Sequence, residues 1–205
     1  MNRPMLESTR QMVTNHLSVS PLVLPMQRVL IATLIYLLTA APSFAQSSFW
    51  RDSSGKPVPE TESMKSKNDF AGSLLATTDE NWQQKWDTPP ETKPHFIRAD
   101  IVPYGKKVYI LIFFANPKLD ENGKASVRCD LRMIAPTGKV SVEQKDAKCF
   151  AGPIQGNQYN LRLSAAMIAF SGDPGDPAGV WSAEVVLRDT VRNVELPLRT
   201  TFTLK

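Results

Sequence analysis

Hydrophobic and polar residues alternate along several segments in the second half of the chain. Successive side chains of a β-strand point to opposite faces, so this alternation indicates a strand with one buried and one wet face. It is clearest over 127–133, 159–163, 181–187 and 194–204. The residues expected to face the core are Val127, Cys129, Leu131, Met133, Tyr159, Leu161, Leu163, Trp181, Ala183, Val185, Leu187, Val194, Leu196, Leu198, Phe202 and Leu204. Four such segments favour antiparallel sheets.

The segment 108–114 (VYILIFF) differs because it is apolar at every position. A strand of this kind is covered on both faces and lies centrally in its sheet. One face must meet the opposing sheet. We expect Trp82 and Trp86, which lie four residues apart, to share one face of a preceding helix and to cover the other.

That helix is predicted over 78–87. Thr77 and Glu80 have the spacing of a capping box, and Pro89 and Pro90 end the segment. Before it, residues 46–68 are rich in Ser, Lys, Glu and Pro without an apolar period, and they are predicted to be a disordered linker.

Further strands are predicted over 96–102 and 140–143. Turn residues separate the strands, and they cluster at 103–105, 120–123, 136–138 and 172–177. Seven strands with frequent turns predict a mainly β domain over 69–205, an antiparallel β-sandwich of immunoglobulin-like type with one short N-terminal helix.

The segment from Gly172 to Asp189 (GDPGDPAGVWSAEVVLRD) strengthens this prediction. A Gly followed by an aromatic residue and an alternating strand that ends in Asp resembles the penultimate strand of bacterial Ig-like and macroglobulin-type sandwich modules. The resemblance covers about 35 residues, through Leu204. It implies a fold and a preference for binding roles, with Trp181 as a structural aromatic, and it transfers no active site.

The first 45 residues have the layout of a secretory leader. Arg28 precedes a mostly apolar run over 29–41, and Ser43-Phe44-Ala45 supplies small residues at the two cleavage positions. We expect cleavage after Ala45. A start at Met26 would make the signal 20 residues long, and residues 1–25 would then be an extension. The product is expected to be periplasmic or secreted, without stable membrane insertion.

Cys129 and Cys149 are the only cysteines, and an exported protein can oxidise them. We expect a disulfide between them, from a strand to the loop before Phe150. Two buried free thiols, or a redox or metal pair, are the alternatives. The 19 residues between the cysteines are fewer than the long interval bridged in immunoglobulin domains.

Charge and composition exclude several classes of function. The chain has 24 Lys and Arg against 20 Asp and Glu, and without residues 1–45 it has 21 against 19. So balanced a chain has no strong attraction to nucleic acid. The arginines on the wet faces are a candidate basic patch for an anionic ligand, although nearby acids favour solvated, paired faces. They are Arg128, Arg132, Arg162, Arg188 and Arg199.

No catalytic set stands out, so we expect no enzyme, metal or cofactor. His95 is the only histidine after the leader, and no serine lies in a nucleophile turn. Asp120 opens a segment similar to a calcium loop, but Leu131 stands where an EF-hand needs a bidentate Glu, which favours a hairpin turn.

We therefore expect a non-enzymatic exported binding module, an adaptor or subunit that contacts another protein of the bacterial envelope. The alternative is a module that binds a carbohydrate or another small ligand, with or without calcium, through Tyr104, Asp173 and Asp176. Trp82 and Trp86 are also candidates for stacking on a sugar or partner, although we expect both to be structural. Phe49 and Trp50 are a further candidate contact for a partner, although two apolar residues just after a cleavage site are more often incidental.

Overall fold

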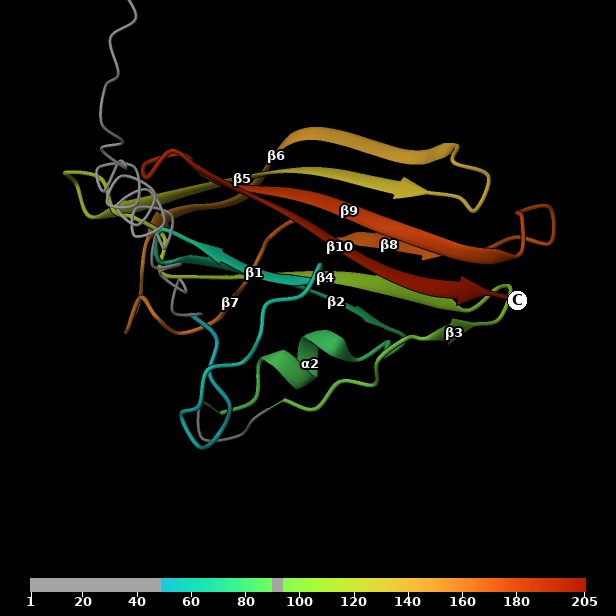
Figure 1. Cartoon of the computed structure of the whole chain (residues 1–205), viewed down its shortest axis with the longest axis horizontal. Coiled ribbons are helices and arrows are strands. Elements are labelled where there is room, and N and C mark those ends of the chain that lie inside the picture. Colours follow the sequence, from blue (N-terminus) through green and yellow to red (C-terminus); the bar gives the residue numbers. More distant parts are fainter. Residues whose placement is uncertain (1–48, 90–93) are drawn as a thin grey trace, which may run out of the picture. The chain divides into compact units, whose positions relative to one another are not determined.

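The computed structural model describes residues 49–89 and 94–205 (Figure 1). The predicted signal peptide, the alternative start at Met26 and the cleavage site after Ala45 lie outside these residues. Within the described part of the chain, no helix is both long and apolar enough to cross a membrane.

The described residues form two five-stranded sheets. In the first sheet the order is β1-β2-β4-β7, and β8 also pairs with β4. Its strands are β1 Met64–Lys67, β2 Phe70–Thr77, β4 Lys107–Ala115, β7 Arg162–Leu163 and β8 Ile168–Ser171. The second sheet has the order β3-β10-β9-β5-β6. Its strands are β3 Ile101–Val102, β5 Lys124–Ile134, β6 Val140–Pro153, β9 Gly179–Asp189 and β10 Val194–Leu204.

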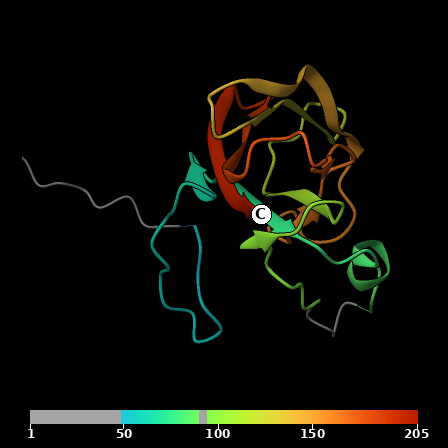
Figure 2. The same cartoon turned by 90° about the vertical axis from the view of Figure 1, so that its right-hand side faces the viewer.

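The pairings confirm the predicted β-sandwich. Neighbouring strands are antiparallel except β3 and β10, which are parallel. A short helix, α2 (Trp82–Trp86), lies on the outer side of the first sheet (Figures 1 and 2). The arrangement is therefore mainly β with one short helix among the described residues, as predicted.

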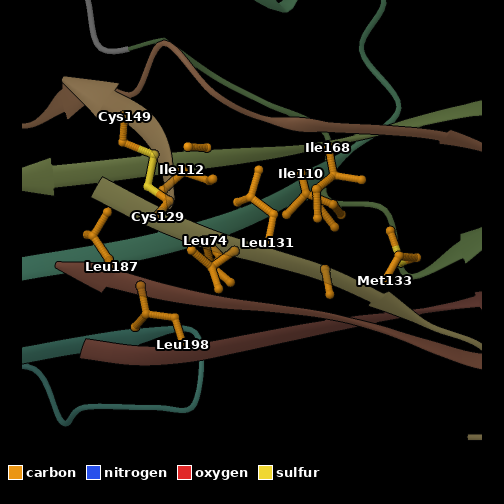
Figure 3. Packing of buried hydrophobic residues seen from close by; sticks show 14 of the residues in the cluster. Leu74, Ile110, Ile112, Cys129, Leu131, Met133, Cys149, Ile168, Leu187 and Leu198 are labelled. Carbon is orange, nitrogen blue, oxygen red and sulfur yellow. A yellow bond between two sulfur atoms is a disulfide. The ribbon is translucent and has the colours of Figure 1, made fainter. Parts of the chain in front are cut away.

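The core lies between the sheets, and Figure 3 shows part of it. Leu74, Ile110 and Ile112 of the first sheet meet Leu131 and Leu187 of the second. The predicted inward residues of β5, β9 and β10 are all buried. Strict alternation of long apolar side chains therefore identified the inner faces of these three strands correctly.

Strand β4 is covered on both faces, also as predicted. Ile110, Ile112 and Phe114 belong to the core between the sheets. Leu111 and Phe113 form a second apolar cluster with Trp82, on the outer side. The helix therefore shields part of the outer face of the first sheet, and Trp82 is only 8% exposed.

The segment before the helix was predicted wrongly. Residues 64–67, placed in a disordered linker, form β1 and pair with β2 from Met64↔Ser73 to Lys67↔Phe70. Strand β2 was not predicted at all. Its sequence FAGSLLAT contains small residues that obscure a period of two. One of these small residues, Gly72, is required by the packing of the two sheets. A Cβ on Gly72 would lie 2.8 Å from a methyl group of Leu187 in the opposing sheet.

The helix is shorter than the predicted 78–87, and the expected capping box does not form. The Thr77 hydroxyl accepts the Asp79 amide at 3.2 Å, two residues on rather than three. The Thr77 hydroxyl donates to the Ile97 carbonyl at 2.7 Å. The Glu80 carboxylate pairs with Lys106 at 2.7 Å. The helix starts at Trp82, after Asn81, whose side chain makes no capping hydrogen bond.

Two further strand predictions need correction. The alternation over 159–163 does not form a full strand, because Tyr159 and Leu161 are 56% and 40% exposed and only Arg162–Leu163 pairs with β4. The strand expected over 96–102 is limited to β3, apart from an isolated bridge between Arg98 and Thr77. Strand β8 was not predicted.

The predicted disulfide is present, but it joins two strands rather than a strand and a loop. Cys129 on β5 and Cys149 on β6 are bonded, with their Cα atoms 5.9 Å apart. The pairing of these strands shifts register at three places, and β6 is three residues longer than β5. At one shift, Arg128 pairs with Lys148 while Val127 pairs with Phe150, so Cys149 is the extra residue of a β-bulge. Cys149 faces the core together with Ala147 two residues earlier, and it is fully buried.

Candidate functional site

The structure brings Tyr104, Asp173 and Asp176 together at one end of the sandwich, where their hydrogen bonds stabilise the local backbone. The Tyr104 hydroxyl donates to the Asp176 carbonyl at 3.0 Å. The Asp176 carboxylate accepts the Asp173 amide at 2.9 Å. Both interactions stabilise the 172–177 turn, which leads into β9 and the buried Trp181. These contacts give the three residues a structural role at the turn.

Trp181 also has a structural environment. Its indole N–H donates to the Pro177 carbonyl at 3.0 Å, and its ring lies 4.6 Å from that of Phe170. Asp120 caps its own turn by accepting the amides of Asn122 and Lys124, as a hairpin turn requires. His95 is exposed. Among the described residues, no group of three or more His, Cys, Asp or Glu side chains is arranged to hold a metal ion.

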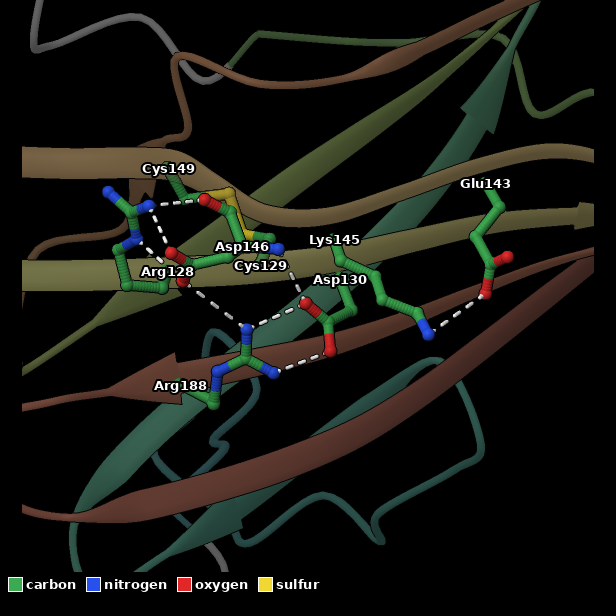
Figure 4. Close-up of polar contacts among 8 residues, drawn as sticks. All are labelled: Arg128, Cys129, Asp130, Glu143, Lys145, Asp146, Cys149 and Arg188. Atoms are coloured by element: carbon green, nitrogen blue, oxygen red, sulfur yellow. Dashed lines mark hydrogen bonds and ion pairs between the residues drawn. A yellow bond between two sulfur atoms is a disulfide. The ribbon is translucent and has the colours of Figure 1, made fainter.

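The outer face of the second sheet carries a network of paired charges (Figure 4). Arg188 binds Asp130 with two parallel hydrogen bonds of 2.7 Å. Arg128 donates to the Asp146 carboxylate and to its carbonyl oxygen, and the Asp146 amide donates to Asp130 at 2.7 Å. Asp146 has a positive φ of 53° at a β-bulge. The network therefore fixes the shape of β6 beside the disulfide.

These pairings change the ionisation of the acids. Hydrogen bonds from Arg188 and from the Asp146 amide lower the pKa of Asp130 from 3.8 to about 2. The hydrogen bond from Arg128 also lowers the pKa of Asp146. Both carboxylates are therefore charged at neutral pH and already engaged.

The five candidate arginines do not form one basic patch. Four of them lie on the second sheet and are paired with acids, whereas Arg162 lies on β7 of the first sheet. Arg132 lies 3.5 Å from Glu184, and Arg199 lies 3.4 Å from Glu62. Arg162 donates to two backbone carbonyls. The pairing of these arginines agrees with the solvated, paired faces that were expected from the neighbouring acidic residues.

A groove of about 750 Å³ opens on the outer face of the first sheet. Its apolar wall is formed by Trp86, Phe96, Phe113, Leu75 and Leu161. The rings of Trp86 and Phe96 lie 5.2 Å and 6.4 Å from that of Phe113. Phe113 itself is only 4% exposed, so the accessible apolar surface is supplied by Leu75, Trp86, Phe96 and Leu161 around the covered centre of β4. We call this site the apolar groove.

The wall of the apolar groove is fixed by contacts at the end of β2. Asp79 is buried, pairs with Lys85 of α2 at 2.8 Å and accepts the Ile97 amide at 2.8 Å. Burial opposes ionisation of Asp79, but Lys85 and the Ile97 amide outweigh it and lower its pKa. Together with the bond from Thr77 to Ile97, these contacts tie α2 and the segment around Phe96 to the same point of the sheet.

The rim of the apolar groove is polar. Thr61, Ser63, Ser73 and Arg98 line it, and the hydroxyls of Thr61 and Ser63 lie 3.2 Å apart. A concave apolar surface with a few polar groups at its edge is typical of sites that bind small molecules.

Sequence reasoning did not identify most of this site. The fully apolar strand over 108–114 correctly implied a covered outer face, and Trp82 is buried there. Trp86, expected to be structural, packs on Phe113 but stays half-buried and borders the apolar groove. Leu161 was expected to face the core and Phe96 to begin a strand, and neither pattern indicated a groove, because their positions depend on the tertiary contacts of irregular segments.

Phe49 and Trp50, the other candidate contact for a partner, pack near Tyr159. The Phe49 ring stacks on that of Tyr159, with centroids 6.2 Å apart and an interplanar angle of 16°. Trp50 contacts Phe49 edge to face at 5.7 Å. The two aromatic residues are thus part of a contact within the chain.

No family model matches the chain, and no curated protein matches it. Among solved structures, the chain is similar to the CARDB domain of a Pyrococcus furiosus protein, with 9% identity and a TM-score of 0.35 over 72% of this chain and 100% of that one. It is also similar to a Niemann-Pick type C2 protein from the Japanese carpenter ant, with 8% identity and a TM-score of 0.33 over 64% and 89%.

A family 123 glycoside hydrolase from Clostridium perfringens matches with 6% identity and a TM-score of 0.36, over 65% of this chain. An alkylpurine DNA glycosylase from Pseudomonas fluorescens matches with 11% identity and a TM-score of 0.34, over 51%. This chain corresponds to only 27% of the length of each of these two enzymes. At such scores none of the four likenesses carries an argument about function.

Proposed function

We propose that this chain is an exported, non-enzymatic binding module of the bacterial envelope that holds a small apolar ligand in the apolar groove. The observation that carries the proposal is the convergence of Trp86, Phe96 and Phe113 on one concave surface that faces outward. The volume of about 750 Å³ falls in the range of roughly 300–1,000 Å³ that is usual for small-molecule sites.

The charged outer face of the other sheet is less suited to binding. Its arginines are engaged with acids or backbone carbonyls, so a ligand would have to break existing pairs. The apolar groove offers hydrophobic surface that is already exposed to water. A ligand that covers this surface releases water without breaking any ion pair. This contrast favours a small apolar ligand in the apolar groove over an anionic ligand on the charged face.

Export and the immunoglobulin-like assignment belong to the same proposal. The disulfide between Cys129 and Cys149 supports export, since such bonds persist in oxidising compartments. Two facing sheets around one core support an Ig-like arrangement.

Binding of an uncharged fluorescent naphthylamine, N-phenylnaphthylamine, to the purified chain tests the proposal. We expect saturable binding that Trp86→Ala weakens at least about tenfold, because removing an aromatic side chain that packs on a ligand commonly costs ~1.4 kcal/mol or more. Val180→Ala is the matched control. It removes a 56% exposed apolar side chain from the other sheet, and we expect unchanged binding.

Equal binding by the two variants would contradict the proposal, and so would no binding by the wild type. An envelope protein that is captured stoichiometrically and released by Trp86→Ala, without any probe binding, would replace it with the protein-partner function.

A further inference from the structure

At one rim the apolar groove continues into a second hollow with different chemistry. The second hollow has a volume of about 200 Å³ and shares Thr61, Ser63 and Arg98 with the apolar groove. Its remaining lining consists of Glu62, Arg199, Thr200 and Thr201. An apolar site therefore opens directly into a polar site that carries two guanidinium groups.

Arg98 has hydrogen-bonding capacity to spare. Its Nε donates to Asp100 at 3.2 Å, and among the described residues its two terminal nitrogens have no partner. The Arg98 and Asp100 side chains are 59% and 77% exposed, so water screens their pairing and it contributes little. The terminal edge of Arg98 is thus available to an acceptor at the mouth of the apolar groove.

The other charges of the second hollow nearly cancel. Arg199 pairs with Glu62 at 3.4 Å, a long contact between side chains that are 46% and 71% exposed. The hydroxyls of Thr61 and Ser63 supply further neutral donors beside Arg98. Arg98 is therefore the group that gives this end of the site its preference for an anion.

We propose that the ligand is a single-chain amphiphile with a carboxylate head, of the fatty-acid class, whose chain fills the apolar groove and whose head binds Arg98. This inference rests on the proposed function. A planar guanidinium matches a carboxylate with two parallel hydrogen bonds, and Arg98 presents an unused edge where the apolar surface ends.

The proposal predicts how affinity depends on the chain and on the head. Each added methylene that enters the apolar groove tightens binding about fourfold, until the groove is full. Replacing the carboxylate by an alcohol of equal length removes the charge-assisted hydrogen bonds, and we expect binding about tenfold weaker. Added salt reduces this difference, because Arg98 is exposed.

Displacement of N-phenylnaphthylamine by dodecanoate, dodecanol and dodecyltrimethylammonium tests the inference, with the two ions kept below their micellar concentrations and the alcohol below its solubility limit. We expect dodecanoate to bind most tightly and the cation most weakly. Arg98→Gln should make dodecanoate and dodecanol equal and leave dodecanol unchanged. Arg132→Gln is the control, since Arg132 is also exposed and paired but lies on the other sheet.

The outcomes separate this inference from the proposed function. If dodecanol and dodecanoate displace the probe equally, or if Arg98→Gln keeps the preference, the carboxylate assignment is wrong while apolar binding stands. If the probe itself does not bind, both fail. A preference lost in Arg98→Gln and kept in Arg132→Gln supports the inference.

Discussion

At the scale of single residues, burial separates two tryptophans that the sequence presents as equivalent. Trp82, at the start of α2, is 8% exposed and its ring lies 6.2 Å from that of Tyr109, whereas Trp86 at the end of α2 is half-buried and borders the apolar groove. Their spacing correctly placed them on one covering helix. The spacing could not show how much of the outer sheet face the helix covers. The extent of that cover depends on the position of Phe96 and on the contacts of Asp79 with Lys85 and Ile97.

This difference predicts opposite effects of the same substitution. Trp82→Ala should lower the free energy of unfolding by about 3 kcal/mol, because it leaves a cavity against Leu111 and Phe113. Trp86→Ala should cost clearly less and act mainly on probe binding. Urea denaturation of both variants measures the first effect. Equal losses of stability would show that Trp86 is also a core residue.

The ionisation of Asp130 predicts a pH dependence. Its pKa is lowered in the folded protein, so its stabilising contribution is complete above its ordinary pKa of 3.8 and is lost as the pH falls towards about 2. Asp130→Asn should therefore be less stable than the wild type at neutral pH, and the difference should shrink across that range.

Thermal melts of both proteins over this pH range provide the measurement. Glu143→Gln is the control, since Glu143 contacts Lys145 only at 3.8 Å on an exposed surface. A difference between the wild type and Asp130→Asn that stays constant down to pH about 2 would contradict the assignment.

At the scale of elements, the sequence predicted strands where long apolar side chains alternate and failed where they do not. Strands β5, β9 and β10 bury every second residue, and their pattern is unambiguous. Strand β2 pairs along eight residues but contains Ala, Gly and Ser, and β1 has no apolar period. Their pairing is determined by neighbouring strands, which a local pattern does not contain.

Strand β6 was also only partly predicted, for a different reason. Its pairing with β5 shifts register at three places, and residues 140–146 are exposed or half-buried on both faces, so the alternation fails although the strand spans 14 residues. Only 140–143 was predicted, and Cys149 was placed in a loop.

The disulfide between β5 and β6 predicts a stability effect at this scale. Replacing both cysteines by alanine should lower the free energy of unfolding by about 3 kcal/mol, because the crosslink closes a loop with a sequence separation of 20. The sandwich should persist, since the charge network still holds the neighbouring bulge. Circular dichroism with urea titration tests both statements. Loss of the β spectrum in the variant would show that the bridge is required for folding.

At the scale of the whole molecule, the two-layer arrangement followed from the sequence, and the candidate site did not. Alternation with one wet face implies facing sheets around one core, and these are present. The apolar groove combines residues from β1, β2, β4, α2 and three irregular segments, and no local motif joins them. The contacts suggested by turn chemistry, at Tyr104 and Asp176, hold one end of the sandwich together instead.

The most direct test of the central claim is an NMR titration of the chain with N-phenylnaphthylamine, following backbone amide and indole N–H resonances. We predict that shifts concentrate at Trp86, Phe96 and Phe113, and that the 172–177 turn and the Trp181 indole stay unchanged. Shifts centred on Tyr104 and Asp176, or no saturable shifts at all, would contradict the claim that the apolar groove is the binding site.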